Sequence, residues 1–346
     1  MSPTTYKQVV LVERPPQDGH ISDNTFKTEE VSYADLKPGP KEVLYKSIYL
    51  SVDPTQRMWI NSKATYMPPV EVGAVMRSAG IGIVVQAGEG SVYKAGDAVW
   101  GLLNWREYGV LPDTSLEKIE VPPNAELLDF LGPLGPVGMT AYFGITDIAK
   151  LKAGETMVVT GAAGATGSFV CQIGKKLGAK IIAIAGSDEK CQWLEKELGV
   201  DKALNYKAPT FKEDFIESVG HFDVFFDNVG GSILNLALTR MALRARIVLC
   251  GAIADYNGKP TGITAYTSLI SQRASMTGFL VSDYRSQYNV ARVEIGKWVK
   301  EKSIKRQFHV LEGIESCSQA LPLLFSGANT GKLVVKLAEP DSVAKL

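Results

Sequence analysis

Short runs of hydrophobic residues, broken by glycine and proline, dominate the first third of the chain. Val, Ile, Leu and aromatic residues gather or alternate in residues 7–14, 42–52, 80–90 and 97–112. These residue types favour strands, and the Gly and Pro residues between the runs mark turns. The pattern therefore predicts a small, irregular, β-rich domain over residues 1–130.

The pattern changes near residue 131, where apolar runs begin to alternate with helical stretches. Near-continuous apolar runs occupy residues 156–161, 180–186, 222–230 and 245–253, and helix-like sequence follows the first three of them. Such alternation indicates a parallel sheet with helices on both faces. A short run before residue 206 and a last run at 276–281 bring the count to six strands, enough for a doubly wound nucleotide-binding sheet. The fold class is thus α/β, with this Rossmann sheet over residues 131–285.

The last part of the chain exceeds what a six-stranded sheet needs. It contains a helix-like stretch at about 288–302, a second around 317–327, and an apolar strand at 332–338. We therefore assign residues 286–346 to the first domain.

Length and composition are those of a two-domain globular protein. The 346 residues exceed one ordinary core, and 45% of them are hydrophobic while 21% are charged. The formal net charge is zero, which does not indicate a basic face for nucleic acid. Since no stretch reaches the apolar length of a membrane span, we expect no membrane association.

The cysteines and the C-terminus bear on the compartment. Cys171, Cys191, Cys250 and Cys317 follow no disulfide or metal-ligand spacing, so we expect free thiols in a reducing compartment such as the cytoplasm. The final residues Ala344-Lys345-Leu346 are close to the peroxisomal Ser-Lys-Leu signal. A solvated tail explains them as well, and we favour that interpretation.

Small residues cluster where the first strand of the second domain meets its helix. Gly161, Gly164 and Gly167 are spaced Gly-x-x-Gly-x-x-Gly rather than Gly-x-Gly-x-x-Gly. Glycine there lets a pyrophosphate approach the backbone, and the helix N-terminus offers N–H groups to an anion. A tightly packed helix start is the alternative, but the strand before and after favours a dinucleotide.

The end of the next strand lacks the acid that NAD-binding sheets place on the ribose hydroxyls. Ala185-Gly186-Ser187 occupies that position, and Lys190 follows on the first helical turn. A carboxylate would repel a 2′-phosphate, whereas small residues and a lysine accommodate it. Ser187 and Tyr206 offer hydroxyl donors nearby. The sequence therefore favours NADP(H) over NAD(H), although a solvated helix lysine is the simpler interpretation of Lys190.

The residues that zinc requires are missing from the first domain. Residues 1–170 contain no cysteine and one histidine, His20, while His221 and His309 lie far away in the sequence. Because catalytic zinc takes three protein ligands, we expect hydride chemistry without metal. Reduction of an activated C=C bond suits this, since it needs one hydrogen-bond donor for the developing oxyanion.

Stretches across nearly the whole chain, from Val9 to Lys336, resemble one protein family. They are residues 49–59, 66–85, 135–145, 158–180, 226–231, 250–257 and 328–336. They are similar to the medium-chain dehydrogenase/reductase superfamily, in its zinc-free branch of prostaglandin reductases (leukotriene hydroxydehydrogenases) and plant alkenal double-bond reductases. The resemblance implies a GroES-like catalytic domain made from both chain ends, a Rossmann domain, and NADPH-dependent reduction of α,β-unsaturated aldehydes and ketones. It also implies a homodimer joined through Rossmann-domain edges.

The resemblance also implies a set of cofactor contacts. Lys190 and Tyr206 match the 2′-phosphate contacts, and Phe279-Leu280-Val281 matches the backbone run that binds the nicotinamide carboxamide. Thr166 stands where the family more often has Val. The remaining implied contacts are Met139 and Thr140 at the nicotinamide end, Gly164, Ala165, Thr166 and Gly167 at the pyrophosphate, and Asn228, Cys250, Ala252, Ile253, Tyr256 and Asn329.

Two tyrosines match the substrate side of the family's site. Tyr256 corresponds to the tyrosine thought to face the substrate carbonyl, and Tyr66 to a region that lines the substrate cleft. Packing roles explain either tyrosine without catalysis. Two other functions remain open: a quinone reductase of the same superfamily, and a non-catalytic NADPH-binding module.

Overall fold

The computed structural model describes residues 3–340 and divides them into two compact units. The first unit covers the residues up to Leu131, Phe308–Asn329, and those from Leu333 onward; the second covers Gly132–Gln307 and Thr330–Lys332. Ala344, Lys345 and Leu346, the residues of the expected tail or targeting signal, lie outside the described residues.

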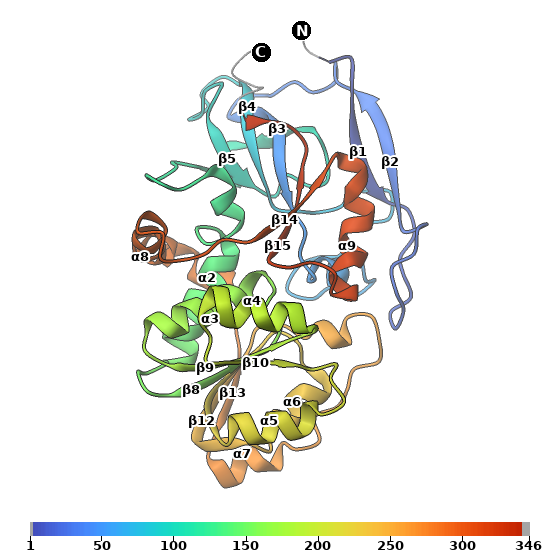
Figure 1. Cartoon of the computed structure of the whole chain (residues 1–346). Coiled ribbons are helices and arrows are strands. Elements are labelled where there is room, and N and C mark those ends of the chain that lie inside the picture. Colours follow the sequence, from blue (N-terminus) through green and yellow to red (C-terminus); the bar gives the residue numbers. More distant parts are fainter. Residues whose placement is uncertain (1–2, 341–346) are drawn as a thin grey trace. The chain divides into compact units, whose positions relative to one another are not determined.

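The first unit is built on antiparallel strands (Figure 1). A two-stranded sheet pairs β1 (Thr5–Leu11) with β2 (Phe26–Ser32). A seven-stranded sheet has the order β14-β15-β3-β4-β5-β7, with β6 pairing to β3. Its strands are β3 (Glu42–Ser51), β4 (Gly80–Ala87), β5 (Ala98–Gly101), β6 (Tyr108–Pro112), β7 (Leu116–Lys118), β14 (Phe308–Glu312) and β15 (Lys332–Lys336). Its helices are α1 (Gln56–Trp59), α9 (Cys317–Ser326) and the 3₁₀ turns Asp113–Ser115, Leu127–Leu131 and Ile314–Ser316.

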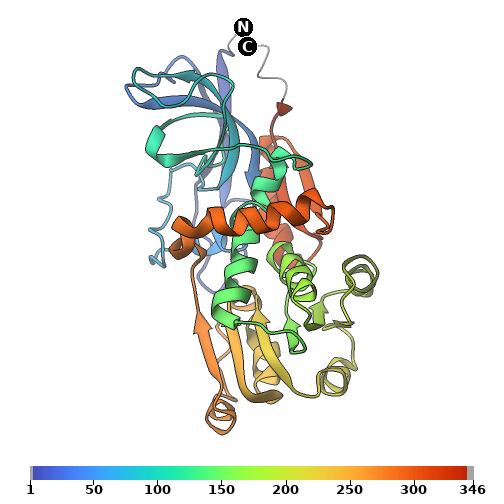
Figure 2. The same cartoon turned by 90° about the vertical axis from the view of Figure 1, so that its left-hand side faces the viewer.

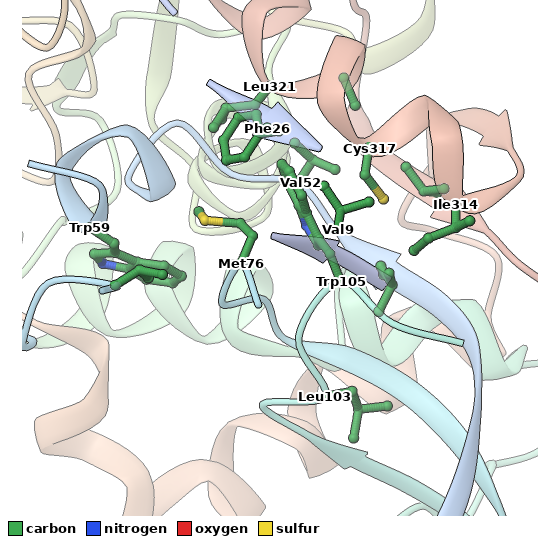
Figure 3. Close-up of a cluster of buried hydrophobic side chains, with 14 of the residues drawn as sticks. Val9, Phe26, Val52, Trp59, Met76, Leu103, Trp105, Ile314, Cys317 and Leu321 are labelled. Carbon is green, nitrogen blue, oxygen red and sulfur yellow. The ribbon is translucent and has the colours of Figure 1, made fainter. Parts of the chain in front are cut away.

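The core of this unit joins the beginning and the end of the chain. Figure 3 shows Val9 and Phe26 packed with Ile314, Cys317 and Leu321. Trp105 is fully buried among them, and its ring lies 5.0 Å from that of Phe26. Burial of side chains that are far apart in sequence stabilises the unit through apolar area removed from water. The C-terminal segment is therefore part of the first unit's core.

The second unit is a parallel, doubly wound sheet. The order β10-β9-β8-β11-β12-β13 reverses direction between β8 and β11, as in a Rossmann fold. The strands are β8 (Thr156–Val159), β9 (Lys180–Ala185), β10 (Lys202–Asn205), β11 (Phe222–Asp227), β12 (Met241–Leu249) and β13 (Ser275–Gly278). The central strand β11 is buried at five of its six residues, which explains its continuous apolar run.

Helices cover both faces of this sheet (Figure 1). One face carries α3 (Ala165–Lys176) and α4 (Asp188–Leu198), and the other carries α5 (Phe211–Val219), α6 (Gly231–Ala237) and α7 (Thr267–Gln272). Before the first strand, α2 (Pro136–Phe143) continues into a π-helix, Gly144–Ala149. After the sheet, the 3₁₀ segment Val281–Gln287 leads into α8 (Tyr288–Lys300); a shorter 3₁₀ turn is Ile253–Asp255. These elements confirm the α/β fold class.

The second boundary between the units lies later than the strand count indicates. Helix α8 packs on the second unit, where Glu294 accepts a 2.6 Å hydrogen bond from the Tyr142 hydroxyl. Arg292 Nε donates to the Leu134 carbonyl at 2.9 Å. Residues 286–307, which we assigned to the first domain, thus lie in the second unit, and the return to the first begins at Phe308. Two long-range hydrogen bonds place α8 in the second unit, and the local sequence pattern predicts neither of them.

Candidate cofactor and active site

The glycine turn lies between β8 and α3, and two of its positions require glycine on steric grounds. Gly161 has a φ of +58°, a backbone conformation that glycine adopts without strain. A Cβ at Gly167 would lie 2.3 Å from the Gly161 carbonyl oxygen, so only glycine lets the helix pack this closely. No side chain caps α3 at Gly164. Ala165, Thr166 and Gly167 begin this twelve-residue helix. Because no side chain occupies its N-terminal N–H groups, they suit a pyrophosphate.

A segment from the end of the chain lies against this turn. The N–H of Gly331 donates to the Ala163 carbonyl at 2.8 Å, and Gly331 forms a bridge with Gly164. A Cβ at Gly331 would lie 2.1 Å from the Gln307 carbonyl oxygen. Asn329, which is 9% exposed, precedes this segment. The backbone of this late segment is thus bonded to the backbone of the glycine turn.

The carboxyl ends of β8 and β11 are joined by a network centred on Thr160. The Thr160 hydroxyl donates to Asp227 Oδ1 at 2.8 Å and accepts from the Asn228 N–H at 2.8 Å. The Asn228 side-chain amide donates to the Thr160 carbonyl at 2.7 Å. Asp227 is fully buried, and desolvation raises its pKa although the N–H groups of Gly230 and Val229 and the hydroxyl of Thr160 act in the opposite direction.

The turns after β11 and β12 bring several expected site residues together. The Asp227 carbonyl accepts from the Cys250 N–H at 2.8 Å, and the Asn228 carbonyl accepts from the Ile253 N–H at 3.4 Å. The N–H of Ala252 donates to the Tyr256 hydroxyl at 3.3 Å. Burial raises the pKa of the Cys250 thiol to about 12, and the charge of Asp227 contributes. Asn228, Cys250, Ala252, Ile253 and Tyr256 thus form one edge of the sheet, where ligands bind in folds of this class.

The expected nicotinamide side is built on the start of α2 and the segment after β13. Met139 is fully buried, and the Thr140 hydroxyl donates to the Pro136 carbonyl at 2.7 Å. The Phe279 ring packs on Gly144, where an added Cβ would lie 3.0 Å from its Cζ. The carbonyl of Val281 accepts a hydrogen bond from Tyr288, and Leu280 is exposed.

Lys190 follows β9, Tyr206 and Lys207 follow β10, and residues 185–187 at the end of β9 include no acid. A Cβ at Gly186 would lie 3.0 Å from Tyr206 Cε1, so the Tyr206 ring covers this residue. Lys207 Nζ lies 5.9 Å from the centre of that ring. Burial lowers the pKa of Lys190, and the charge of Lys207 lowers it further. Ser187 caps α4 by accepting from the Lys190 N–H at 3.3 Å.

Tyr66 belongs to the first compact unit, whereas Tyr256 belongs to the second. The Tyr66 hydroxyl lies 2.5 Å from the Thr55 hydroxyl and accepts from Trp59 Nε1 at 3.1 Å. The side chain is 48% exposed. A polar group held by two neighbours and open to solvent can meet a ligand, so its place in the substrate site stays a prediction.

Two family models match the sequence. The model described as the N-terminal domain of oxidoreductase covers residues 7–119, and the model described as zinc-binding dehydrogenase covers residues 165–294. Prostaglandin reductase 1 of Bos taurus is 37% identical over 328 residues, covering 92% of this chain and 95% of the relative. The NADP(+)-dependent 2-alkenal reductase of Nicotiana tabacum is 36% identical over 340 residues, covering 96% of this chain and 97% of the relative.

The chain belongs to the medium-chain dehydrogenase/reductase superfamily. Within it, the chain belongs to the branch of prostaglandin and alkenal reductases. A solved structure has the same fold. CurA from Vibrio vulnificus, solved in complex with NADPH, superposes with a TM-score of 0.90 at 32% identity, covering 96% of this chain and all of that one.

One matching model is named for zinc. Among residues 3–340, no group of three His, Cys, Asp or Glu side chains is placed to hold a metal ion. None of the helices in the described part of the chain is long and apolar enough to cross a membrane.

Sequence reasoning missed two residues that the structure places beside the expected site residues. Lys207 stands next to the predicted Tyr206, and the cation in the run Leu204-Asn205-Tyr206-Lys207 was a signal for it. Asp227 lies within the quoted stretch at residues 226–231. Its side chain accepts from the neighbouring N–H groups of Val229 and Gly230, but its burial and its bond from Thr160 depend on strand pairing. No local signal identifies Asp227 as a link between strands.

Proposed function

We propose that this chain reduces the C=C bond of α,β-unsaturated aldehydes and ketones with NADPH, without zinc. The cofactor is NADP(H). Lys190 after β9 and Lys207 after β10 carry the cofactor assignment, together with the Tyr206 ring that covers Gly186. Membership in the prostaglandin and alkenal reductase branch supports the class of substrate.

The two lysines favour a phosphorylated ribose on electrostatic grounds. Burial, and then the charge of Lys207, disfavour the charged form of Lys190, which raises the free energy of the empty site. A 2′-phosphate dianion relieves this repulsion and accepts charge-assisted hydrogen bonds. The unphosphorylated nucleotide offers no such charge, so it binds more weakly.

The carboxyl edge of the sheet supplies the groups for the reaction. When bound, NADPH supplies the hydride that the β-carbon of the enone receives. Negative charge then develops on the carbonyl oxygen, and the Tyr256 hydroxyl stabilises it as a hydrogen-bond donor. The bond that Tyr256 accepts from Ala252 N–H strengthens its hydroxyl as a donor. A proton from solvent or from that hydroxyl completes the saturated product at the α-carbon.

The reaction does not need a Lewis acid. An enolate disperses its charge over the C=C–O unit, and one well-placed donor lowers the barrier to forming it. The scattered histidines His20, His221 and His309 support the metal-free proposal.

Consumption of NADPH with three classes of acceptor tests the proposal. The loss of NADPH absorbance is followed with a 2-alkenal, an enone and a quinone, with NADH as the matched control donor. We expect turnover of the alkenal and the enone with a strong preference for NADPH. Turnover of the quinone alone favours the related quinone reductase, and turnover of none favours a binding module.

The sheet edge at β13 supports a homodimer. Helix α7 beside it has no buried residue, and exposed apolar side chains surround it: Leu243 (55%), Tyr266 (58%) and Ile270 (75%). An unpaired strand edge flanked by apolar residues favours pairing with a second copy. Light scattering after size-exclusion chromatography should give twice the chain mass, and Ile270→Glu should reduce it. A monomer for the parent chain contradicts this proposal.

We propose the cytoplasm as the compartment. Cys171, Cys191, Cys250 and Cys317 are all free thiols, which suits a reducing environment. Microscopy of the full chain with an N-terminal fluorescent tag tests this, and peroxisomal puncta contradict it.

A further inference from the structure

The carbonyl of Val281 is held by a side chain outside the expected site. Tyr288, the first residue of α8, donates its hydroxyl to this carbonyl at 3.1 Å. The Tyr288 side chain is buried, with 9% of the residue exposed. A half-buried hydrogen bond to a backbone carbonyl limits how far that backbone can rotate.

Tyr288 is itself fixed by its helix. The guanidinium of Arg292, one turn later, lies 5.7 Å from the centre of the Tyr288 ring, and Arg292 Nε donates to the Leu134 carbonyl at 2.9 Å. The orange helix α8 lies across α2 (Figure 2), and the Phe143 ring of α2 lies 6.4 Å from that of Tyr288. The hydroxyl is therefore presented from a rigid position.

The other end of the same backbone run is fixed by packing. A Cβ at Gly144 would lie 2.6 Å from Phe226 Cε2 and 3.0 Å from Phe279 Cζ, so the Phe279 ring fills the space that glycine leaves. Phe279 is thus wedged at one end of the run and Val281 is bonded at the other. Leu280 lies between two fixed points.

We propose that Tyr288 is a positioning residue for the nicotinamide end of the cofactor. Its hydroxyl fixes the orientation of the peptide groups in Phe279-Leu280-Val281, the run that the family resemblance assigns to the carboxamide. This inference rests on the proposed function, because it concerns the same NADPH site. Tyr288 acts through Val281 and does not touch the reacting atoms.

Binding of two ligands to Tyr288→Phe separates positioning from general stability. The substitution keeps the ring and removes only the hydroxyl. The probes are NADPH and 2′-phospho-ADP-ribose, which retains the phosphates and adenosine but lacks nicotinamide. We expect the Kd for NADPH to rise about fivefold, which corresponds to the loss of one ordinary hydrogen bond. The Kd for 2′-phospho-ADP-ribose should stay the same, because that ligand never reaches the run.

Tyr142→Phe is the matched control. Its hydroxyl also bonds to α8, at Glu294, but makes no bond to residues 279–281. We expect Tyr142→Phe to leave both dissociation constants unchanged. Faster hydrogen exchange of the amides of residues 280–282 in Tyr288→Phe, and not in Tyr142→Phe, is a second expected result.

The outcomes are distinct. The role of Tyr288 is overturned if the two dissociation constants rise equally or if neither changes. It is also overturned if Tyr142→Phe has the same effect as Tyr288→Phe. A parent protein that binds neither ligand contradicts the proposed function instead. Parent binding of both ligands with an unaffected Tyr288→Phe leaves the function intact and removes this inference alone.

Discussion

Burial lowers the pKa of Lys190, and the charge of Lys207 lowers it further, although the two lysines belong to different turns of the chain. Lys190 is on the first turn of α4, and Lys207 follows β10. Parallel pairing of β9 with β10 places Asn205 beside Ala185, which brings both turns to the same edge of the sheet. Like charges held together in this way indicate an anionic ligand.

Removing Lys190 should weaken the binding of NADPH but not that of NADH. In Lys190→Ala we expect the Michaelis constant for NADPH to rise about tenfold to a hundredfold, since a charged hydrogen bond is lost. The rate at saturation should change little, and the constants for NADH should not change. Lys196→Ala, an exposed lysine in the last turn of the same helix, is the control. Equal losses with NADPH and NADH contradict the assignment.

The preference for NADPH should depend on pH. Since burial and Lys207 lower the Lys190 pKa, its positive charge is lost at a lower pH than in an ordinary lysine. The affinity for NADPH should therefore fall relative to NADH as the pH rises through that pKa. Lys207→Ala removes one cause of the shift and should move the fall to higher pH. Fluorescence titrations between about pH 7 and pH 10 measure this, a range below the reference lysine pKa of about 10.4.

A flat NADPH-to-NADH ratio across that range is inconsistent with a lysine contact. A fall that Lys207→Ala leaves at the same pH contradicts the coupling between the two residues.

Tyr256→Phe should slow the chemical step and leave cofactor binding intact. Removing one donor to a developing oxyanion costs on the order of 100-fold in the rate at saturation. The Kd for NADPH should stay within about twofold, because the proposed bond forms only to substrate. Tyr49→Phe, in strand β3 of the other unit, controls for loss of a tyrosine hydroxyl. An unchanged rate in Tyr256→Phe would show that another group donates the hydrogen bond to the oxyanion.

Thr160→Val should destabilise the second unit. The valine keeps the shape but leaves the buried Asp227 carboxylate without one donor and the Asn228 N–H without its acceptor. We expect the free energy of unfolding to fall by about 2 kcal/mol. The substitution also removes a hydrogen bond that lowers the Asp227 pKa, so that pKa should rise further. Chemical denaturation measures the loss.

Thr146→Val is the control for the same change at an exposed site, where the hydroxyl bonds only to a carbonyl of its own helix. A loss as large in Thr146→Val as in Thr160→Val would show that the strand-end network adds nothing.

The sequence by itself determined the features that depend on local pattern. The continuous apolar runs of β9 and β11 predicted a parallel sheet, because strands buried on both faces need apolar residues at every position. The glycine at 167 followed from the close packing of a helix on its turn. Ala185-Gly186-Ser187 has no acid at the end of the strand, and this predicted the choice of cofactor before any contact was known.

Only the tertiary structure decided which distant residues meet. Strand order joined Thr160 to Asp227, and packing on α2 placed α8 in the second unit. The bond from Tyr288 to Val281 has the same origin. Side-chain spacing within a helix or strand is set by its period and can be read locally. Contacts between elements depend on how the whole sheet and its helices pack, so no short stretch of sequence contains them.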